Sequence, residues 1–445
     1  MNTDVGSPPV ATASAAPEPP VWLLPAITRF PRHGSEGAQR SSTETFDAHI
    51  ATWGPLTAWA TPLSPESVTE LVAEIAAAQL TGRGGGHFPA ARKWQAVIAA
   101  GPGGVVVANG AEGEPLSAKD AALLQTRPHL VLDGLQLAAL ATGAENAYIW
   151  LHAGAHATET SVRHAIVERL AAGLPGPRIE LRTGPEHYLS GESSAVMQAL
   201  SGGPALPAFR RVPGAAYGVQ GRPTLLHNVE TLARIAVIAR GLDASGTQPH
   251  GGIRSSLVTV ITREGRTVTE VRPAASLAEV VTTHVPNVHS QAVLLGGYGG
   301  SWVPWATFTS IAAHELSARA VGLSIGAGIL APLSDISCGV SETARIVDYL
   351  ADSSARQCGP CLFGLRSVAD LINSLAAGDL SRSDRRNLTR YLSEIAGRGG
   401  CHHPDGAIRL INSMLTTFGE DVDSHLRKGR CRHGSPRPSI PVPGF

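Results

Sequence analysis

Four separate stretches of the chain combine residues suited to binding a flat, phosphorylated ligand. TGRGGGHFPAARKW (81–94) is glycine-rich, and ANGAEGEPLSAKD (108–120) carries clustered carboxylates. Glycines let a backbone approach a phosphate or a ring closely, and exposed N–H groups bind anions. Carboxylates cannot hold phosphate, but they accept hydrogen bonds from ribose hydroxyls or a nicotinamide amide. EHYLSGESSA (186–195) and GRPTLLHNVETLA (221–233) add further Gly, Glu and Asn. Each stretch alone is also compatible with an ordinary solvated loop.

A second chemistry is indicated by ARQCGPC (355–361), in which Cys358 and Cys361 form a CxxC pair. Such a pair serves as a redox dithiol, half of a zinc site or part of an iron–sulfur cradle. A thioredoxin-like dithiol needs a preceding strand, and the preceding segment here has a helical pattern, which disfavours that interpretation. Two buried cysteines among helices remain a further alternative. The five cysteines are odd in number and sparse, which argues against a disulfide framework. Cys431 is expected to be an ordinary thiol, and Cys338 is not expected to join the other cysteines because it precedes the helix that leads to Ala355.

Composition narrows the class of protein. The 445 residues carry 36 Lys and Arg against 36 Asp and Glu, so net charge gives no case for binding nucleic acid or an acidic membrane surface. No apolar run approaches the roughly 18 residues of a membrane helix. The first ten residues, MNTDVGSPPV, lack the pattern of a secretory signal. We therefore expect a cytoplasmic protein without direct membrane insertion.

The expected elements place these stretches on a scaffold. Ser64 and Pro65 begin a helix, residues 105–108 form a buried strand, and a helix and then a strand at 146–152 follow, which is the pattern of an α/β sheet. Two alternating strands and a short helix over 255–282 indicate a small α+β module. After Ser337 the apolar spacing predicts about four helices, with Cys358, Cys361 and Cys401 at the turns between them.

The order and spacing of the motifs resemble one family, the NADH-binding flavoprotein subunit of respiratory NADH:quinone oxidoreductase (complex I) and its relatives in NAD-reducing hydrogenases and formate dehydrogenases. The family's GRGGAGFPTGLKW is similar to Gly82–Trp94, and its NADEGEPGTFKD to Asn109–Asp120. Its YICGEETA is similar to Tyr188–Ala195, and its GKPTVVNNVETL to Gly221–Leu232. The resemblance covers about residues 50–420.

The resemblance implies an α/β fold class and a domain order. It implies a Rossmann-like FMN-binding domain, a small ubiquitin-like α+β (SLBB) module and a C-terminal helical bundle. We expect a disordered arm at 1–45, the FMN- and NADH-binding domain at 46–250, the SLBB module at 251–335, a four-helix bundle with the Cys motif at 336–425, and an irregular tail at 426–445.

The resemblance also implies a mechanism and a set of site residues. NADH would pass hydride to FMN, and the flavin would release single electrons to an iron–sulfur cluster and a ferredoxin-like or other redox partner subunit, with the chain peripheral to any membrane complex. Glu112 and Glu114 are expected at the catalytic centre. The expected cofactor-binding residues are Gly82, Arg83, Gly84, Phe88, Lys93, Asn109, Glu112, Glu114, Tyr188, Gly191, Glu192, His227, Asn228 and Thr231.

Several departures from the family pattern bear on function. A family Asp is Ala111, and a family Asn is His227. The second Glu of GEET, which in the family faces the adenosine ribose, is Ser193, so discrimination against NADP(H) is expected to relax. Of the phenylalanines that sandwich the adenine, only Phe88 is present.

The cysteine motif is also incomplete. The family's ESCGxCxPC has three cysteines and a fourth about forty residues later, whereas here the first is Ala355 and Cys358, Cys361 and Cys401 match the others. A four-iron (4Fe-4S) cluster with a non-Cys fourth ligand such as His402, His403 or Asp405, a three-iron (3Fe-4S) cluster, and loss of the cluster to thiols or zinc all remain open. The same departures favour an alternative function, that of a non-catalytic nucleotide-binding or scaffold subunit.

Overall fold

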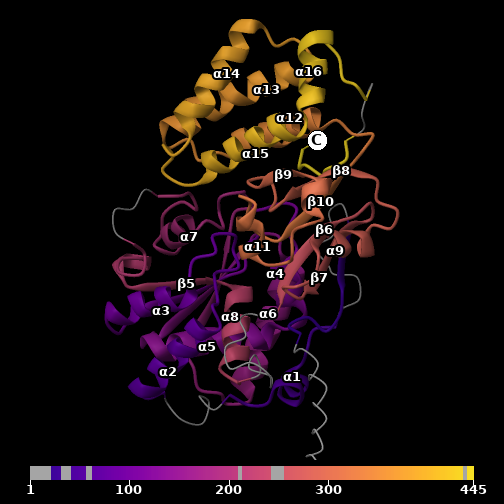
Figure 1. Ribbon diagram of the computed structural model, residues 1–445. Helices are drawn as coiled ribbons and strands as arrows, with labels where there is room; N and C mark the ends of the chain where they lie inside the picture. The colour runs from indigo at the N-terminus through magenta and orange to yellow at the C-terminus, as the bar shows by residue number, and fades with distance from the viewer. Residues whose placement is uncertain are drawn as a thin grey trace, which may run out of the picture.

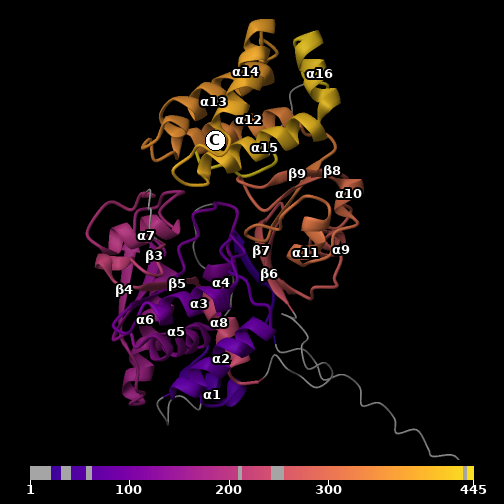
Figure 2. The same cartoon turned by 60° about the vertical axis from the view of Figure 1, so that its left-hand side comes forward.

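The computed structural model describes residues 22–31, 42–56, 63–208, 213–241, 255–433 and 438–444. Two β-sheets and a group of C-terminal helices make up this part of the chain (Figure 1). The N-terminal half forms the lower part of the view, the second sheet lies beside and above it, and the C-terminal helices form the top. Figure 2 shows the second sheet and the C-terminal helices from another side. The fold is therefore mixed α/β, with one parallel and one mixed sheet.

The first sheet has four parallel strands in the order β4-β3-β2-β5. The central strand β2, VVVAN, is almost entirely apolar because both of its faces are covered, whereas the edge strand β4, RIELRTG, is largely exposed. Val106 and Ala108 of β2 pack in the cluster that holds α5 and α8, whereas Val105 and Val107 face a smaller cluster with α7. The elements of this half are α1 Phe46–Trp53, α2 Pro65–Ala77, α3 Ala90–Ala99, β2 Val105–Asn109, α4 Lys119–Thr126, α5 Pro128–Thr142, β3 Asn146–His152, α6 His156–Ala171, β4 Arg178–Gly184, α7 Ser193–Leu200, η2 Val219–Gly221, β5 Thr224–Asn228 and α8 Val229–Ile238.

The connections of this sheet create a switch in strand order. From β2 the chain moves outward to β3 and β4, and it then returns to place β5 on the other side of β2. Ligands of open parallel sheets bind beyond the carboxyl ends of the strands at such a point. Asn109 and Asn228 end β2 and β5 and are paired in register. The fold thus brings two of the predicted site residues side by side.

The second sheet has six strands in the order β1-β7-β6-β10-β8-β9. The predicted hairpin and helix near 255–282 are confirmed as β6, β7 and α9, and Ser276 caps that helix by accepting a hydrogen bond from the Glu279 N–H. The elements are β1 Thr28–Pro31, β6 Ser256–Ile261, β7 Gly265–Val271, α9 Leu277–His284, β8 Ser290–Leu295, β9 Ser301–Pro304, α10 Trp305–Phe308, α11 Glu315–Ala320 and β10 Ile329–Ser334.

The strand β1 corrects the expectation of a disordered arm over residues 1–45. Thr28–Pro31 pairs antiparallel with Gly265–Val268 of β7, and Phe30 is buried. Residues 1–21 and 32–41 lie outside the described part of the chain, so the expectation is untested there. The edge of the second sheet is therefore supplied by the N-terminal region.

The C-terminal helices are α12–α16, together with the short π-helical turn η4. They pack around an apolar cluster that includes Ile346, Leu365, Leu392 and Ile411. The sequence indicated about four helices, whereas α16 adds a fifth among the described residues. The bounds are α12 Gly339–Asp352, η4 Pro360–Gly364, α13 Leu365–Ala377, α14 Arg382–Ile395, α15 His403–Thr417 and α16 Gly419–Lys428.

In the expected tail from residue 426, the described residues beyond α16 (429–433 and 438–444) are irregular, and part of them is held against this cluster. Ile440 and Val442 are buried. The Glu342 carboxylate accepts a hydrogen bond of 3.2 Å from the Ile440 N–H and another from the Ser439 N–H at 2.6 Å. The Tyr298 hydroxyl donates to the Pro441 carbonyl. The tail is thus a packed part of the C-terminal region.

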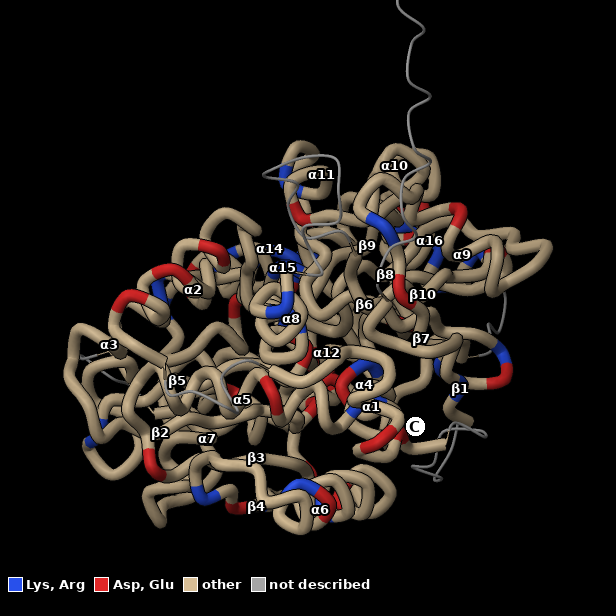
Figure 3. Tube along the Cα trace, turned by 90° about the horizontal axis from the view of Figure 1, so that it is seen from below, with Lys and Arg blue, Asp and Glu red and all other residues tan. Residues whose placement is uncertain are grey.

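The distribution of charged residues along the chain agrees with its balanced composition. Figure 3 shows Lys and Arg interspersed with Asp and Glu along the trace. Within the described residues, no helix combines the length and the apolar character required to cross a bilayer.

Candidate functional site

A cleft of about 700 Å³ opens at the switch in strand order of the parallel sheet. Asn109 and Asn228 form its floor, and the second sheet and the C-terminal helices contribute the opposite wall. Ligand sites in proteins commonly have volumes of about 300–1,000 Å³. Nine of the predicted cofactor residues line the cleft: Arg83, Gly84, Asn109, Glu112, Glu114, Tyr188, Gly191, Glu192 and Asn228.

The glycine-rich loop forms one wall of the cleft. Its start is anchored because the Arg83 N–H donates a 3.0 Å hydrogen bond to Thr231 Oγ1. Among the described residues, none accepts a hydrogen bond from the N–H groups of residues 84–86. N–H groups without a protein acceptor, held at the edge of a cleft, suit an anion such as phosphate. The Arg83 guanidinium donates to Ser256 Oγ at 3.1 Å and so joins this loop to the second sheet.

The acidic loop after β2 is held by its own side chains. Asn109 Nδ2 donates a 2.8 Å hydrogen bond to the Gly191 carbonyl, which ties this loop to the segment before α7. Glu112 accepts a 3.0 Å hydrogen bond from the Ala121 N–H and another from the Ser117 hydroxyl. Glu112 therefore fixes the shape of the loop, while its exposed surface still faces the cleft.

Glu114 links the two walls of the cleft. Its carboxylate accepts hydrogen bonds from the Tyr298 N–H at 2.8 Å and the Tyr188 hydroxyl at 3.4 Å. Burial raises the pKa of Glu114 to about 7, although the hydrogen bonds that it accepts act in the opposite direction. This carboxyl group can therefore change its charge near neutral pH.

A buried positive charge lies behind the cleft floor. Lys119 Nζ lies 2.6 Å from Asp120 Oδ1, 3.3 Å from Glu230 Oε2 and 3.4 Å from Asn228 Oδ1. Burial acts to lower the pKa of Lys119, but the neighbouring carboxylates outweigh it and raise the pKa. Burial acts to raise the pKa of Glu230, but Lys119, Arg234 and Arg83 lower it to about 2. The cluster keeps Lys119 charged at the edge of the site.

The other predicted cofactor residues do not line the cleft. Gly82 lies within the turn that closes the glycine-rich loop, where its N–H donates to the Phe88 carbonyl at 2.8 Å. The Phe88 side chain is 52% exposed, with the Arg92 guanidinium over its ring. Thr231 is buried and holds the Arg83 N–H, as described above.

The side chains of Lys93, on α3, and His227, within β5, lie close to each other. Lys93 Nζ donates a 2.7 Å hydrogen bond to the Leu226 carbonyl, and burial lowers the pKa of Lys93 to about 8. His227 Nε2 accepts a 3.0 Å hydrogen bond from Trp94 Nε1. Burial, with the charge of Lys93, holds the pKa of His227 well below its usual value. Both side chains support the strand that ends in Asn228.

The three predicted metal-ligating cysteines come together beside the cleft. Cys358 precedes η4, Cys361 lies within it, and Cys401 lies just before α15 and lines the cleft. Burial, together with the nearby thiols of Cys358 and Cys401, raises the pKa of Cys361 to about 12. Burial also raises the pKa of Cys401, and the charges of Glu192, Cys358 and Asp405 contribute. A metal centre would therefore have to displace the protons from these thiols.

The residues considered for a fourth ligand differ in their surroundings. His403 is buried, its Nε2 lies 2.8 Å from the Leu350 carbonyl, and burial lowers its pKa to about 4. His402 is exposed, with its Nδ1 3.4 Å from Asp405 Oδ2. Ala355 lies in the loop between α12 and η4 and offers no ligand atom. Of these, His402 has the greatest freedom to turn toward a metal.

The sequence missed the wall contributed by the second sheet and the C-terminal helices. The run GGYGG at 296–300 was an available signal, because several glycines between two strands permit close backbone approach. The other residues that line this wall had no recognisable motif in the sequence around them. The lining residues not predicted include Gly296, Gly299, Gly300, Ser301, Glu315, Arg319, Gly326, Ala327 and Arg409, together with Ser117, Lys119 and Asp120.

Comparison with known proteins adds independent findings. A family model described as the Nuo51 FMN-binding domain matches residues 75–237, and one described as the NADH-ubiquinone oxidoreductase-F iron-sulfur binding region matches residues 341–425. The chain is similar to the F subunits of NADH-quinone oxidoreductase. It is 28% identical to the F 2 subunit of the enzyme from Rhizobium meliloti, over 83% of this chain and 90% of that protein. The resemblance drawn from the motifs is confirmed.

Two further comparisons extend this relationship. The F subunit of the NADH-quinone oxidoreductase of Mycobacterium tuberculosis is 26% identical, over 96% of this chain and 95% of that protein. The solved structure of an NAD+-reducing NiFe hydrogenase in the H2-reduced state matches with a TM-score of 0.71 and 25% identity, over 84% of this chain and 67% of that chain. The fold is therefore shared with a chain of an NAD+-reducing hydrogenase.

Proposed function

We propose that this chain oxidises NADH with a bound FMN and delivers the electrons one at a time to an iron–sulfur cluster and then to a partner redox protein. The observation that carries the proposal is the cleft itself. The glycine-rich loop, the acidic loop and Cys401 all line this one cleft. The matches to an FMN-binding domain and an iron–sulfur binding region support the same pairing of cofactors.

The residues of the cleft fit FMN. The N–H groups of residues 84–86 would bind its phosphate, and Lys119 would add a positive charge nearby. Asn109, Glu112 and Asn228 would present polar groups to the ribityl chain and the ring edge from the floor. Bound FMN would accept a hydride from NADH and release the electrons singly.

The protein side chains would then orient the substrate and stabilise charge. Glu114 faces the cleft from between the two walls, where its carboxylate would contact the nicotinamide of NADH. We propose Glu114 as the catalytic residue. Glu112 acts instead as a positioning residue, because its carboxylate is engaged by the Ala121 N–H and the Ser117 hydroxyl.

The exit for electrons would be the cysteine group. Cys401 lines the cleft, and its thiol lies within electrostatic reach of Cys358 and of Glu192, which caps α7. We propose that Cys358, Cys361 and Cys401 hold the cluster, with a fourth ligand other than cysteine. We also propose the parallel sheet with its helices as the FMN domain, the six-stranded sheet as the ubiquitin-like module, and α12–α16 as the helical bundle that carries the cluster.

The test is anaerobic purification followed by visible spectroscopy before and after addition of NADH or NADPH, with an iron assay and electron paramagnetic resonance on the same sample. We expect flavin bands that bleach with NADH, and iron at several atoms per chain. A matched control is the same protein stripped of flavin, in which bleaching should return only after FMN is added. A chain that binds no FMN and leaves NADH unoxidised would overturn the proposal in favour of a scaffold subunit.

A further inference from the structure

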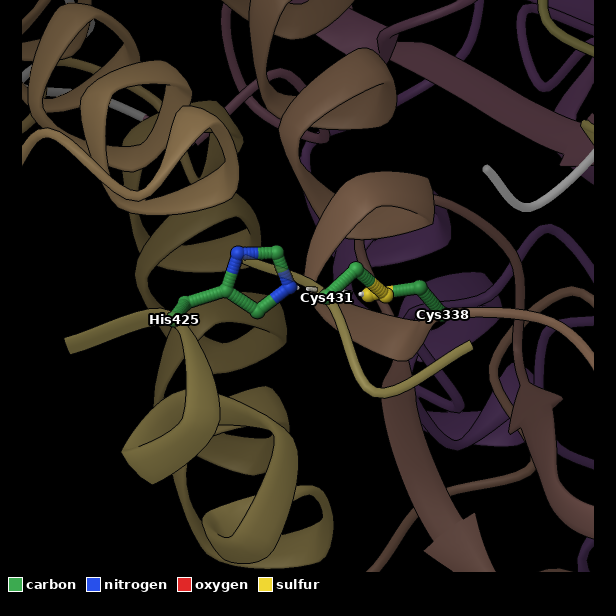
Figure 4. Close-up of side chains that lie close together, drawn as sticks. All are labelled: Cys338, His425 and Cys431. Atoms are coloured by element: carbon green, nitrogen blue, oxygen red, sulfur yellow. Dashed lines mark hydrogen bonds between the residues drawn. The ribbon is translucent and has the colours of Figure 1, made fainter. Parts of the chain in front are cut away.

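Three potential metal ligands meet at a place separate from the cleft and from the predicted cluster cysteines. Cys338 precedes α12, His425 lies on α16, and Cys431 follows α16. Their ligand atoms all lie within 4.8 Å of one another. Figure 4 shows the imidazole and the two thiols pointing toward a common point. Nothing in the sequence indicated that Cys338, His425 and Cys431 would meet.

The three side chains are held in place before any ion binds. Cys338 and His425 are buried, and His425 Nε2 lies 3.4 Å from Cys338 Sγ. Gly429 ends α16 in a left-handed conformation, with φ of 59°, which turns the chain so that Cys431 returns toward His425. The Ser424 hydroxyl donates to the Arg430 carbonyl at 3.0 Å and fixes this return.

Both sulfur atoms accept a hydrogen bond from a backbone N–H. The Ser341 N–H donates to Cys338 Sγ at 3.4 Å, and the His433 N–H donates to Cys431 Sγ at the same distance. Backbone N–H groups directed at sulfur stabilise metal-bound thiolates, as partners outside the ligand set commonly do. The His425 imidazole also interacts with the backbone of Leu375 and Ala376 at the end of α13, and such partners help to orient a metal-binding histidine.

We propose that Cys338, His425 and Cys431 bind one zinc ion. Two sulfurs and an imidazole nitrogen form a ligand set typical of zinc, whose tetrahedral site has ligand–ligand edges of about 3.5 Å. The 3.4 Å separation of His425 Nε2 and Cys338 Sγ matches such an edge. The fourth position would be filled by water or by His433, which follows Cys431 by two residues.

The proposed zinc would have a structural role. This proposal does not depend on the proposed redox function. The ion would join the start of α12 to the end of α16 and to the tail. The same tail is held by Glu342 and Tyr298, and α12 leads into the loop before Cys358. Closing a long loop of chain in this way stabilises the folded state by restricting the unfolded one.

The first test needs no variant. The full chain, purified anaerobically with a reductant, should contain one zinc per chain by elemental analysis in addition to any iron, and zinc-edge X-ray absorption should show two sulfurs and at least one nitrogen. A wild-type protein without zinc, or one in which mass spectrometry finds a disulfide between Cys338 and Cys431, would overturn the proposal.

A pair of variants then separates this site from the cluster. Cys431→Ser should lose the zinc equivalent, keep its iron and flavin, and melt at a lower temperature. The matched control, Cys358→Ser, should lose iron and retain the zinc. Cobalt added to the zinc-free wild type should give the visible bands of a tetrahedral thiolate complex, and Cys431→Ser should abolish them. Full zinc content in folded Cys431→Ser would contradict the assignment.

Discussion

Glu114 differs from Glu112 in what its carboxylate contacts. Glu112 accepts hydrogen bonds from its own loop, whereas Glu114 accepts one from the Tyr298 N–H in the second sheet. Burial raises the pKa of Glu114 to about 7. The sequence offered two carboxylates of equal standing. Only the three-dimensional contacts distinguish Glu112, which is held by Ser117 and Ala121, from Glu114, which joins its loop to the second sheet.

This difference predicts a pH-dependent rate. The nicotinamide gains positive charge as it loses hydride, so an ionised Glu114 should stabilise the transition state. Flavin reduction by NADH should therefore accelerate as the pH rises through about 7. In Glu114→Gln the profile should be flat in this range, with a rate about tenfold lower at pH 8, which corresponds to about 1.4 kcal/mol.

Stopped-flow measurement of flavin bleaching checks this prediction. Glu264→Gln, at an exposed position in the turn between β6 and β7, is the control and should leave the profile unchanged. A Glu114→Gln protein that binds FMN and keeps the wild-type pH profile would show that another group titrates.

At the scale of elements, the turn between β8 and β9 sets the position of Glu114. Gly297 has φ of 90°, and a Cβ built on it would lie 2.5 Å from Glu114 Oε2. Gly297→Ala should displace the carboxylate and slow flavin reduction about as much as Glu114→Gln. It should also destabilise the protein by about 1 kcal/mol, since a left-handed backbone disfavours alanine.

Two controls separate these effects. Gly202 has φ of 91° with no atom within 4 Å of a built Cβ, so Gly202→Ala should lose stability without loss of rate. Gly299 lines the same cleft. A Cβ built on it would lie 3.6 Å from the Tyr188 hydroxyl, which is an ordinary contact distance, so the flavin of Gly299→Ala should bleach at the normal rate. Equal rates for all three variants in stopped-flow, with unfolding midpoints alone differing, would refute the positioning role of the turn.

A buried charged network joins α1, α5 and α6. His49 Nε2 lies 2.8 Å from Asp133 Oδ2, Arg169 contacts the same carboxylate at 2.8 Å, and His129 Nε2 lies 2.9 Å from Glu168 Oε2. Burial lowers the pKa of His129 to about 4, with the charges of His49 and Arg169 acting in the same direction and Glu168 opposing them. The histidine is thus neutral in the folded protein at pH values where the unfolded chain is protonated.

The network therefore predicts acid sensitivity. A histidine with a lowered folded pKa contributes stability above its unfolded pKa of about 6.5, and this contribution is lost as the pH falls toward the folded value. Between pH 6.5 and 4 the free energy of unfolding should fall by about 3 kcal/mol through this group. Urea unfolding across this range should show a shallower pH dependence in His129→Gln than in the wild type. The exposed His289→Gln, outside this network, should behave as the wild type does, and identical slopes in His129→Gln and the wild type would exclude His129 as the cause.

Elements with local signals were predicted from the sequence, and those formed by distant contacts were not. The α2 start was predicted because Ser64 accepts a hydrogen bond from the Ser67 N–H, and β3 because its apolar run is bounded by turns. By contrast, β1 forms because it pairs with residues 265–268. Cys431 lies near Cys338 because the five helices between them pack together. Neither contact leaves a periodic or capping pattern in the nearby sequence.

At the scale of the whole molecule, the cleft is shared by three regions that each contribute a different chemistry. The parallel sheet supplies the floor, the second sheet supplies the backbone that holds Glu114, and the C-terminal helices supply Cys401. The motifs predicted the floor because a strand end and a following loop are continuous in sequence. They predicted the facing wall poorly because most of its residues come from separate turns and helices, far apart in the sequence, that meet only in the folded chain.

Because different regions contribute the floor and Cys401, we predict that a substitution can stop electrons from leaving the flavin without stopping NADH from reducing it. Cys361 is buried within η4 and does not line the cleft, whereas its neighbour Cys401 does. Cys361→Ala should therefore lose most of its iron and its paramagnetic cluster signal, yet bind FMN and bleach with NADH at close to the wild-type rate. Transfer to a one-electron acceptor protein should fall by at least tenfold, because the reduced flavin has lost its nearest outlet.

Iron analysis, electron paramagnetic resonance and stopped-flow bleaching on one preparation check all three parts. Cys431→Ser, which alters a thiol outside the cluster group, is the matched control and should keep both iron and transfer. If Cys361→Ala lost FMN together with iron, the cluster would be needed to hold the cleft closed, and the C-terminal helices would be part of the flavin site rather than only its outlet.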